Sequence, residues 1–188
     1  MTVKDYMNIM ECMAPESLAC KWDHVGLMAG HPAYEVTGVL ICMELSAHTV
    51  PEALDKGCNL VITHHPAIFH PLATLREDIR ENTLLCEAVR NRIAVYSAHT
   101  NLDYAEDGVE ESLVRILCTE EVLRTPDGQH FFGVLPRPLP LSDFIAHAAT
   151  VLDTAPRTIL PSEAGGVSDI TVSQVGCACG AFDGEVYW

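Results

Sequence analysis

Residues 58–66 read CNLVITHHP, an apolar run that stops abruptly at two histidines and a proline. The branched apolar residues of this run indicate a short buried β-strand, and Pro66 ends it because proline has no backbone N–H to donate. Similar runs lie before and after it, VTGVLIC at 36–42 and IAVYSA at 93–98. We therefore expect three strands in this part of the chain.

The segments around these strands have apolar residues at helical spacing. Thr49-x-x-Glu52 resembles a capping box and precedes a short apolar face that ends at Gly57. Strands that alternate with helices predict a parallel α/β sheet with right-handed crossovers. The positions that define the four expected helices are Val3, Tyr6, Met7 and Met10; Val50, Ala53 and Leu54; Leu84, Leu85, Ala88 and Val89; and Val109, Leu113, Ile116 and Leu117.

A second α/β unit is expected after the turn-forming stretch TPDGQ at 125–129. There the pattern restarts with HFFGVLP, a helix from about Ser142, and two expected strands, RTIL at 157–160 and DITVSQVGCACGA at 169–181. We expect an N-terminal domain at 1–125 and a second unit at 126–188. The second unit lacks a closing helix in this sequence and is expected to be incomplete.

The composition excludes several classes of protein. A net charge of −15 with only 11 Lys and Arg residues argues against a nucleic-acid partner, which would require a basic surface. Lys4, Asp5 and Glu11 interrupt what would have to be the apolar region of a signal peptide, and no run approaches the length of a membrane span. We expect a cytoplasmic protein with no membrane partner.

The eight cysteines have no C-x-x-C spacing and mostly lie in apolar segments, which is typical of reduced core residues. An alternative is that Cys177 and Cys179 share a strand face and bind a soft metal ion.

Imidazole and carboxylate side chains follow two neighbouring strands. His64 and His65 come directly after the strand at 58–63, and His99 and Asp103 follow the strand at 93–98. In open α/β sheets, ligands bind at the carboxyl ends of the strands, so these four residues predict a site there. The combination suits Zn, Mn, Fe, Ni or Co; a purely structural role is the alternative. Five other histidines do not follow a predicted strand in this way, and we expect them to be structural or exposed: His31, His48, His70, His130 and His147.

His64 and His65 point to opposite faces if the strand continues through them. They share one ion only if the chain turns at Pro66; otherwise each serves a different ion. Two divalent ions about 3.5 to 4 Å apart, bridged by an acid such as Asp103, fit both cases and form a common hydrolytic design.

The loop Lys21–Leu27 is a weaker candidate, in which Asp23 either turns the backbone or supports the metal ligands from behind. Nucleotide-binding glycine motifs, G-x-S-x-G and H-E-x-x-H are absent from the sequence, which removes the simplest dehydrogenase and serine-hydrolase readings.

Three segments together resemble the GTP cyclohydrolase type 2 homologue family, also called the Nif-three-like family. LACKWDHVGLMAGHP (18–32) is similar to its W-D-N-x-G-L-x-x-G loop, ITHHPAIF (62–69) to its T-H-H-P-x-x-F motif, and YSAHTNLD (96–103) to its H-T-N-L-D motif. The motifs occur in the family's order, and the resemblance extends over nearly the whole chain.

The resemblance implies a two-domain α/β fold with mostly parallel sheets flanked by helices. It also implies a dinuclear metal site lined by His64, His65 and Asp103, with His99 close by, and a ring-shaped homohexamer. If His99 is not a ligand, it is the best general acid or base, because the ordinary pKa of an imidazole lies near neutral pH. The implied activity is metal-dependent hydrolysis of a nucleotide or similar small molecule, for which GTP would lose formate after opening of its imidazole ring. A non-catalytic metal-binding or partner-binding protein, or an inactive fragment, is the alternative.

Three departures from the family pattern are visible. His24 replaces the loop asparagine, and Glu44 stands where an aspartate is usual. Family members also continue to a further His and Glu that complete the metal shell, so we expect this chain to bind metal more weakly than an extended form.

Overall fold

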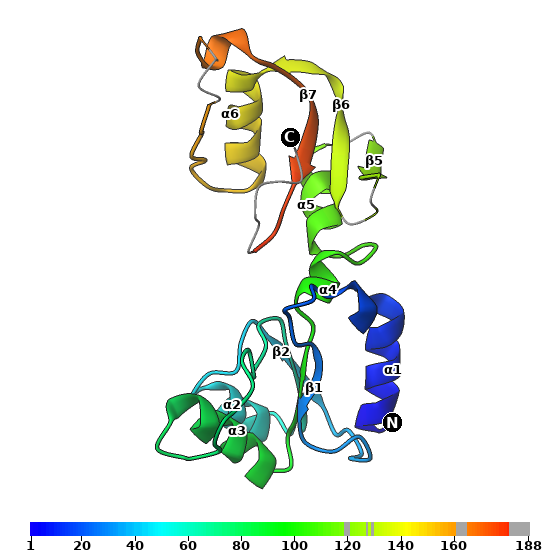
Figure 1. Cartoon of the computed structure of the whole chain (residues 1–188), viewed down its shortest axis with the longest axis vertical. Helices are drawn as coiled ribbons and strands as arrows, with labels where there is room; N and C mark the ends of the chain where they lie inside the picture. The colour runs from blue at the N-terminus through cyan, green and yellow to red at the C-terminus, as the bar shows by residue number, and fades with distance from the viewer. Residues whose placement is uncertain (119–120, 127, 129, 161–164, 181–188) are drawn as a thin grey trace. The chain divides into compact units, whose positions relative to one another are not determined.

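The computed structural model describes residues 1–118, 121–126, 128, 130–160 and 165–180. The chain divides into two compact units, Met1–Glu106 and Asp107–Trp188 (Figure 1). The first unit contains α1 (Val3–Met13), η1 (Glu16–Leu18), β1 (Gly26–Ala29), β2 (Val39–Cys42), α2 (Thr49–Asp55), β3 (Leu60–Thr63), α3 (Arg80–Arg90), β4 (Ala94–Ser97) and α4 (Thr100–Asp103).

The sheet of the first unit has the strand order β1-β4-β3-β2. β2, β3 and β4 are parallel, as expected for strands joined by crossover helices, whereas β1 runs antiparallel to β4. β2 forms one edge of this sheet, and its Ile41 is 76% exposed.

Alternating residues of β3 and β4 face two separate cores, because successive strand side chains point to opposite faces. Val61 and Val95 pack with Val50 and Ala53 of α2 and with Ala88 of α3. On the other face, the core consists of Val3 of α1 with Leu60, Ala94, Tyr96 and Ala98. Figure 1 accordingly shows α2 and α3 on one side of the sheet and α1 on the other.

The expected capping box at Thr49-x-x-Glu52 is wrong. His48 is the N-cap of α2 and makes no capping side-chain hydrogen bond, because Thr49 already lies inside the helix and its Oγ1 accepts from the backbone N–H of Ser46. The structure has a capping box instead at α1, between Thr2 and Asp5.

The second unit contains α5 (Val109–Leu117), β5 (Glu121–Arg124), β6 (Phe131–Pro140), α6 (Leu141–Val151), η2 (Val167–Asp169) and β7 (Thr171–Cys177). Its sheet, β5-β6-β7, is antiparallel throughout, so the expected parallel arrangement holds only in the first unit. The short turn at Thr125, where Gly128 donates to the Thr125 carbonyl, explains this for β5 and β6, because a tight connection joins only antiparallel strands.

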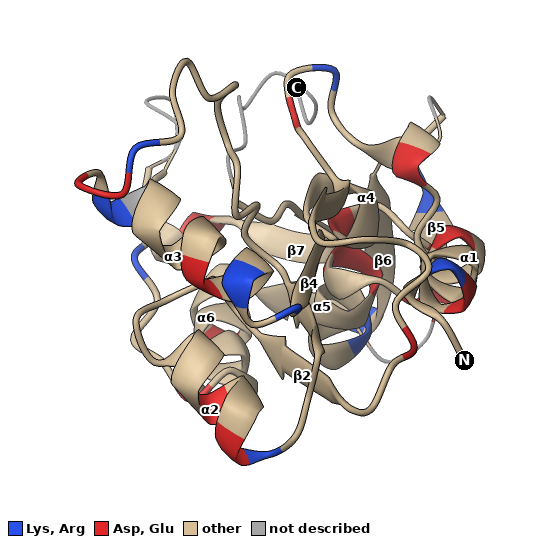
Figure 2. Cartoon of the chain, turned by 90° about the horizontal axis from the view of Figure 1, so that it is seen from below, with Lys and Arg blue, Asp and Glu red and all other residues tan. Residues whose placement is uncertain are grey.

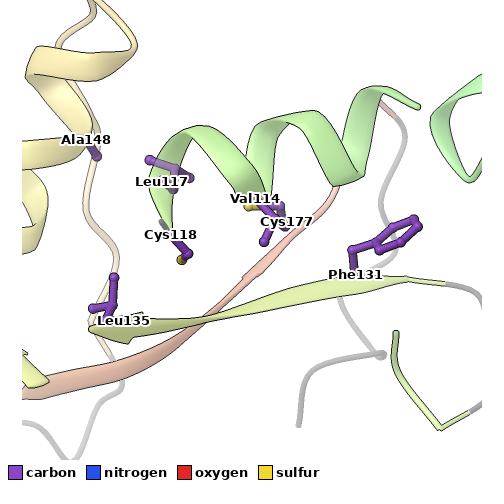
Figure 3. Close-up of a cluster of buried hydrophobic side chains, with 7 residues drawn as sticks. All are labelled: Val114, Leu117, Cys118, Phe131, Leu135, Ala148 and Cys177. Carbon is purple, nitrogen blue, oxygen red and sulfur yellow. The ribbon is translucent and has the colours of Figure 1, made fainter. Parts of the chain in front are cut away.

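The core of the second unit explains why α5 is grouped with it, so that the units divide at 106/107 and not at 125/126. Figure 3 shows Val114, Leu117 and Cys118 at the end of α5 facing Phe131 and Leu135 of β6, with Cys177 and Ala148 completing the cluster. Gly133 leaves room for this contact, since a Cβ there would lie 2.5 Å from the Cys118 Cβ.

The expected strand RTIL at 157–160 is wrong, because these residues have no regular secondary structure and Ile159 is 95% exposed. β1 and β5 form where no strand was expected. β2, β3 and β4 contain no acidic or basic residue, whereas α2 and α3 carry several (Figure 2). None of the helices in the described part of the chain is long and apolar enough to span a membrane.

Candidate metal centre

The carboxyl ends of β3 and β4 are joined by a buried hydrogen bond. Thr63 and Ser97 are register partners, and their hydroxyl oxygens lie 2.8 Å apart. The Thr63 hydroxyl donates to the carbonyl of His65, and the Ser97 hydroxyl accepts from the N–H of Ala67. These bonds fix the turn that carries the two adjacent histidines.

His64 and His65 leave this turn in different environments. The Nδ1 atom of His64 lies 3.0 Å from the carbonyl oxygen of Ala98, which accepts its proton, and its Nε2 atom lies 3.7 Å from Oδ1 of Asp103. The backbone of His65 donates to Met43, and its Nδ1 atom lies 3.5 Å from Oε2 of the exposed Glu44. The chain bends at His64 and His65, directly before Pro66, and the two rings lie 5.4 Å apart between centroids.

The one-turn helix α4 brings Asp103 back towards the strand ends. His99 is its N-cap residue, and its backbone N–H donates to Oδ1 of the fully buried Asn101. Asn101 in turn donates to the carbonyl of Ala14 at the end of α1. This buried amide holds the segment in place, so that Asp103 faces His64.

His99 is held by the carboxylate of Asp23. Its Nδ1 atom lies 2.9 and 3.0 Å from the two oxygens, and the backbone N–H and hydroxyl of Thr100 donate to the same carboxylate. Burial raises the pKa of Asp23, but hydrogen bonds from Thr100, His99 and His24 outweigh it, so the pKa is lowered. Of the two roles expected for Asp23, support of a site residue is therefore observed, together with acceptance of the His24 N–H.

The pKa of Asp103 is shifted in the opposite direction from that of Asp23. Asp103 is 4% exposed, and its Oδ1 atom has no hydrogen-bond partner among the described residues. Burial raises the pKa of this carboxyl, although the neighbouring His64 and His99 act to lower it. A buried carboxylate without a hydrogen bond is costly unless a positive charge is placed beside it.

The three imidazoles form a triangle beside Asp103. The ring centroid of His99 lies 5.2 Å from that of His64 and 6.0 Å from that of His65. The four predicted site residues are thus gathered at one edge of the sheet. Sequence reasoning missed the contact of Glu44 with His65, whose only signal was its place after the strand at 36–42.

These side chains fit a divalent ion in chemistry, because imidazole and carboxylate groups are common metal ligands. In the part of the chain that the structure describes, however, no three His, Cys, Asp or Glu side chains already converge as a complete metal-binding group. The unpartnered Oδ1 atom of Asp103 and the held Nδ1 atoms of His64 and His65 support the fit, because such contacts leave the Nε2 atoms of these two rings available as ligands.

Four other histidines are not part of the imidazole triangle. His31 accepts from Ala33, His70 contacts Phe69, His147 contacts the carbonyl of Leu117, and His130 lies 3.0 Å from the buried Glu110 in the second unit.

The alternative soft-metal site at Cys177 and Cys179 is disfavoured. Burial raises the pKa of Cys177 to about 12, and a soft metal ion would need the thiolate.

The strand-end histidines, the α4 turn and the Asp23 loop together correspond to the three motifs that the sequence analysis singled out. A model of the Duf34/NIF3 (NGG1p interacting factor 3) family matches residues 1–187. The chain belongs to this family. Membership of the Duf34/NIF3 family confirms the resemblance and the α/β fold in two units.

Curated relatives in the Duf34/NIF3 family include two named "GTP cyclohydrolase 1 type 2 homolog". The one from Clostridium acetobutylicum is 39% identical over 115 residues, which are 61% of this chain and 43% of that protein. The one from Lactococcus lactis is 38% identical over 122 residues, 65% of this chain and 48% of that protein. The matched region thus spans less than half the length of these relatives.

Solved structures of related proteins share the fold. The crystal structure of Staphylococcus aureus protein SA1388 has a TM-score of 0.73 at 23% identity and covers 94% of this chain and 71% of its own. Reduced HcgD from Methanocaldococcus jannaschii has a TM-score of 0.67 at 25% identity and covers 80% of this chain and 60% of its own.

Proposed function

We propose that this protein binds divalent metal ions at His64, His65 and Asp103 and acts as a metal-dependent hydrolase of a nucleotide or similar small molecule. The observation that carries the proposal is the buried Oδ1 atom of Asp103, which has no hydrogen-bond partner among the described residues and lies beside a triangle of imidazoles. A cation there would offset the cost of burying the carboxylate. The names of the curated relatives support a nucleotide as substrate.

Bound divalent ions would supply positive charge and Lewis acidity, which activate water and polarise an oxygen of the substrate. His64 is already fixed by the Ala98 carbonyl, so its Nε2 atom is the one available as a ligand. His65 is more exposed and held only by Glu44, which leaves it freer to adjust its orientation. We propose a stoichiometry of two ions, which His64, His65 and Asp103 would help to hold.

His99 is suited to proton transfer. Its Nδ1–H donates to the Asp23 carboxylate, which fixes the tautomer and leaves Nε2 free to accept a proton. The same carboxylate stabilises the ring once Nε2 is protonated, as a general base requires.

The first test is metal content. We expect zinc or manganese to bind the intact chain, and His65→Ala and Asp103→Ala to lower the bound metal measured by elemental analysis while thermal unfolding stays cooperative. Asp55→Ala, an exposed carboxylate on α2, is the matched control and should retain full metal content. Loss of cooperative unfolding with metal content unchanged would show that these residues are structural.

The second test is turnover. GTP is the first substrate to screen, with formate and the ring-opened product followed as readouts. Activity should be abolished by a chelator, restored by manganese or zinc, and lowered at least tenfold by His99→Ala. Activity that survives chelation would contradict the mechanism, whereas metal binding without turnover on a broad panel would favour a non-catalytic metal-binding protein.

We also propose, from the family resemblance alone, that the chain assembles as a homohexamer. Light scattering of the purified protein would measure its mass directly, and a monomer would contradict the proposal.

A further inference from the structure

Two large aromatic side chains lie exposed beside the imidazole triangle. Trp22 is 48% exposed and Phe69 is 44% exposed, although both rings are costly to leave in water. Their centroids lie 6.0 Å apart with an angle of 50° between the planes. They come from different motifs, so their proximity is produced by the fold.

Both rings pack against His99 edge-on. The Trp22 and His99 centroids lie 6.2 Å apart at an interplanar angle of 73°, and those of Phe69 and His99 lie 6.4 Å apart at 75°. His99 is the residue that we place in proton transfer. The aromatic pair therefore adjoins the proposed reacting centre directly.

The hydrogen bonds that hold the site also anchor the segments that carry these two rings. The carboxylate of Asp23, next to Trp22, is fully buried and accepts from Thr100 and His99, while the backbone N–H of Cys20 donates to the Thr100 hydroxyl. The segment leading to Phe69 is held where Ala67 donates to Ser97. Two exposed rings on anchored segments lose little freedom when a ligand binds them.

We propose that Trp22 and Phe69 form a stacking surface for a planar heteroaromatic ring of nucleobase size, whose polar edge faces the imidazoles. The inference rests on the proposed function and names the part of the substrate that the site recognises. A purely apolar ligand would gain from the aromatic faces but would leave the imidazole nitrogens without partners, so a ring bearing nitrogen and oxygen atoms fits better. Base–aromatic stacking is sequence-tolerant because every base has a π-face.

Fluorescence of Trp22 provides the test. The chain has two tryptophans, so Trp188→Phe leaves Trp22 as the single reporter. Guanosine, titrated into the full chain with zinc and again with a chelator, should quench this fluorescence saturably in at least one of the two conditions. Ribose 5-phosphate, which carries the sugar and phosphate without a base, should not.

Variants identify the surface. By calorimetry, Trp22→Ala should weaken guanosine binding by about 5- to 100-fold, and Phe69→Ala by a smaller factor. Trp22→Phe should retain most of the affinity, because it keeps a ring. Leu54→Ala, a side chain of similar exposure on α2, should have no effect. Zinc content and thermal midpoint should be unchanged in Trp22→Ala, which separates stacking from damage to the metal site.

Equal binding of ribose 5-phosphate, unchanged guanosine affinity in Trp22→Ala, or absence of guanosine binding in both conditions would overturn the inference. Failure of the proposed function would be seen in different measurements. Either the wild-type chain would bind no zinc, or Asp103→Ala would keep its full zinc content. The two results are measured with different probes.

Discussion

The three imidazoles of the site differ in what holds their Nδ1 atoms. His64 is fixed by a backbone carbonyl, His99 by the buried carboxylate of Asp23, and His65 by the exposed Glu44. A side chain held by a buried partner keeps its orientation without a ligand, whereas one held at the surface is screened by water. We therefore expect His65 to be the ligand that moves most when a metal ion binds.

Asp103→Asn should stabilise the metal-free protein and weaken metal binding. It removes a buried charge whose Oδ1 atom has no partner in the described structure, a cost of about 1 to 3 kcal/mol. Because burial raises the folded pKa of Asp103, its favourable contribution is full below the unfolded pKa of about 3.9 and is lost as the pH rises through the folded pKa. The gap between variant and wild type should thus be largest at neutral pH and close in acid.

Urea unfolding in the presence of a chelator measures this gap across pH, with Asp55→Asn as the exposed control. A variant less stable than wild type at neutral pH would show that the Asp103 carboxylate is satisfied in the folded protein.

Asp23→Ala should lower zinc affinity by about 10- to 100-fold without changing the number of ions bound at saturation, because Asp23 holds Thr100 at the start of α4, the helix that carries the proposed ligand Asp103. The folded pKa of Asp23 is lowered, so its contribution to stability is present above the unfolded pKa and is lost as the pH falls through the folded pKa. The variant should therefore lose stability mainly at neutral pH. Calorimetric titration with zinc and unfolding at two pH values test both parts, and undiminished affinity would refute the supporting role.

At the scale of the elements, local pattern predicted β2, β3, β4 and β7 among the strands and α1, α2, α3, α5 and α6 among the helices, because each has apolar residues at the spacing of its element. β1 could not be predicted, since it is four residues long, begins at Gly26 with φ +94°, and forms through pairing with β4. The same reason limits how much of the site can be predicted from the sequence. His64, His65, His99 and Asp103 follow predictable strands, whereas Glu44 and the two aromatic rings reach the site through loop geometry that no local pattern encodes.

Gly30→Ala should destabilise the first unit far more than Gly57→Ala. Both glycines have positive φ, +95° and +67°, so the backbone strain is similar, but a Cβ at Gly30 would lie 2.6 Å from the Cα of Ala94, whereas Gly57 has open space. We expect about 1 kcal/mol for Gly57→Ala and at least 2 kcal/mol more for Gly30→Ala. Equal urea midpoints for the two variants would show that the end of β1 can move away from β4 without loss of stability.

At the scale of the whole molecule, every proposed ligand lies in one compact unit. Residues 1–106 contain two cores of their own as well as Asp23, His64, His65, His99 and Asp103. We expect a fragment of these residues to fold and to bind zinc within about tenfold of the affinity of the 188-residue chain. Circular dichroism and zinc calorimetry would measure this, and a fragment that folds but binds no zinc would place a necessary ligand in the second unit.

The open edge of β2 affects how readily copies of the protein aggregate in solution. Ile41 in β2 and Met43 just after it are 76% and 60% exposed. The outer side of β2 has no partner strand among the described residues, and such an edge is a template for association between copies. At neutral pH the net charge of −15 opposes uncontrolled association through this edge, but acid weakens that repulsion as the carboxylates protonate. Solutions should therefore turn turbid on acidification before the chain unfolds, and Ile41→Lys should keep them clear.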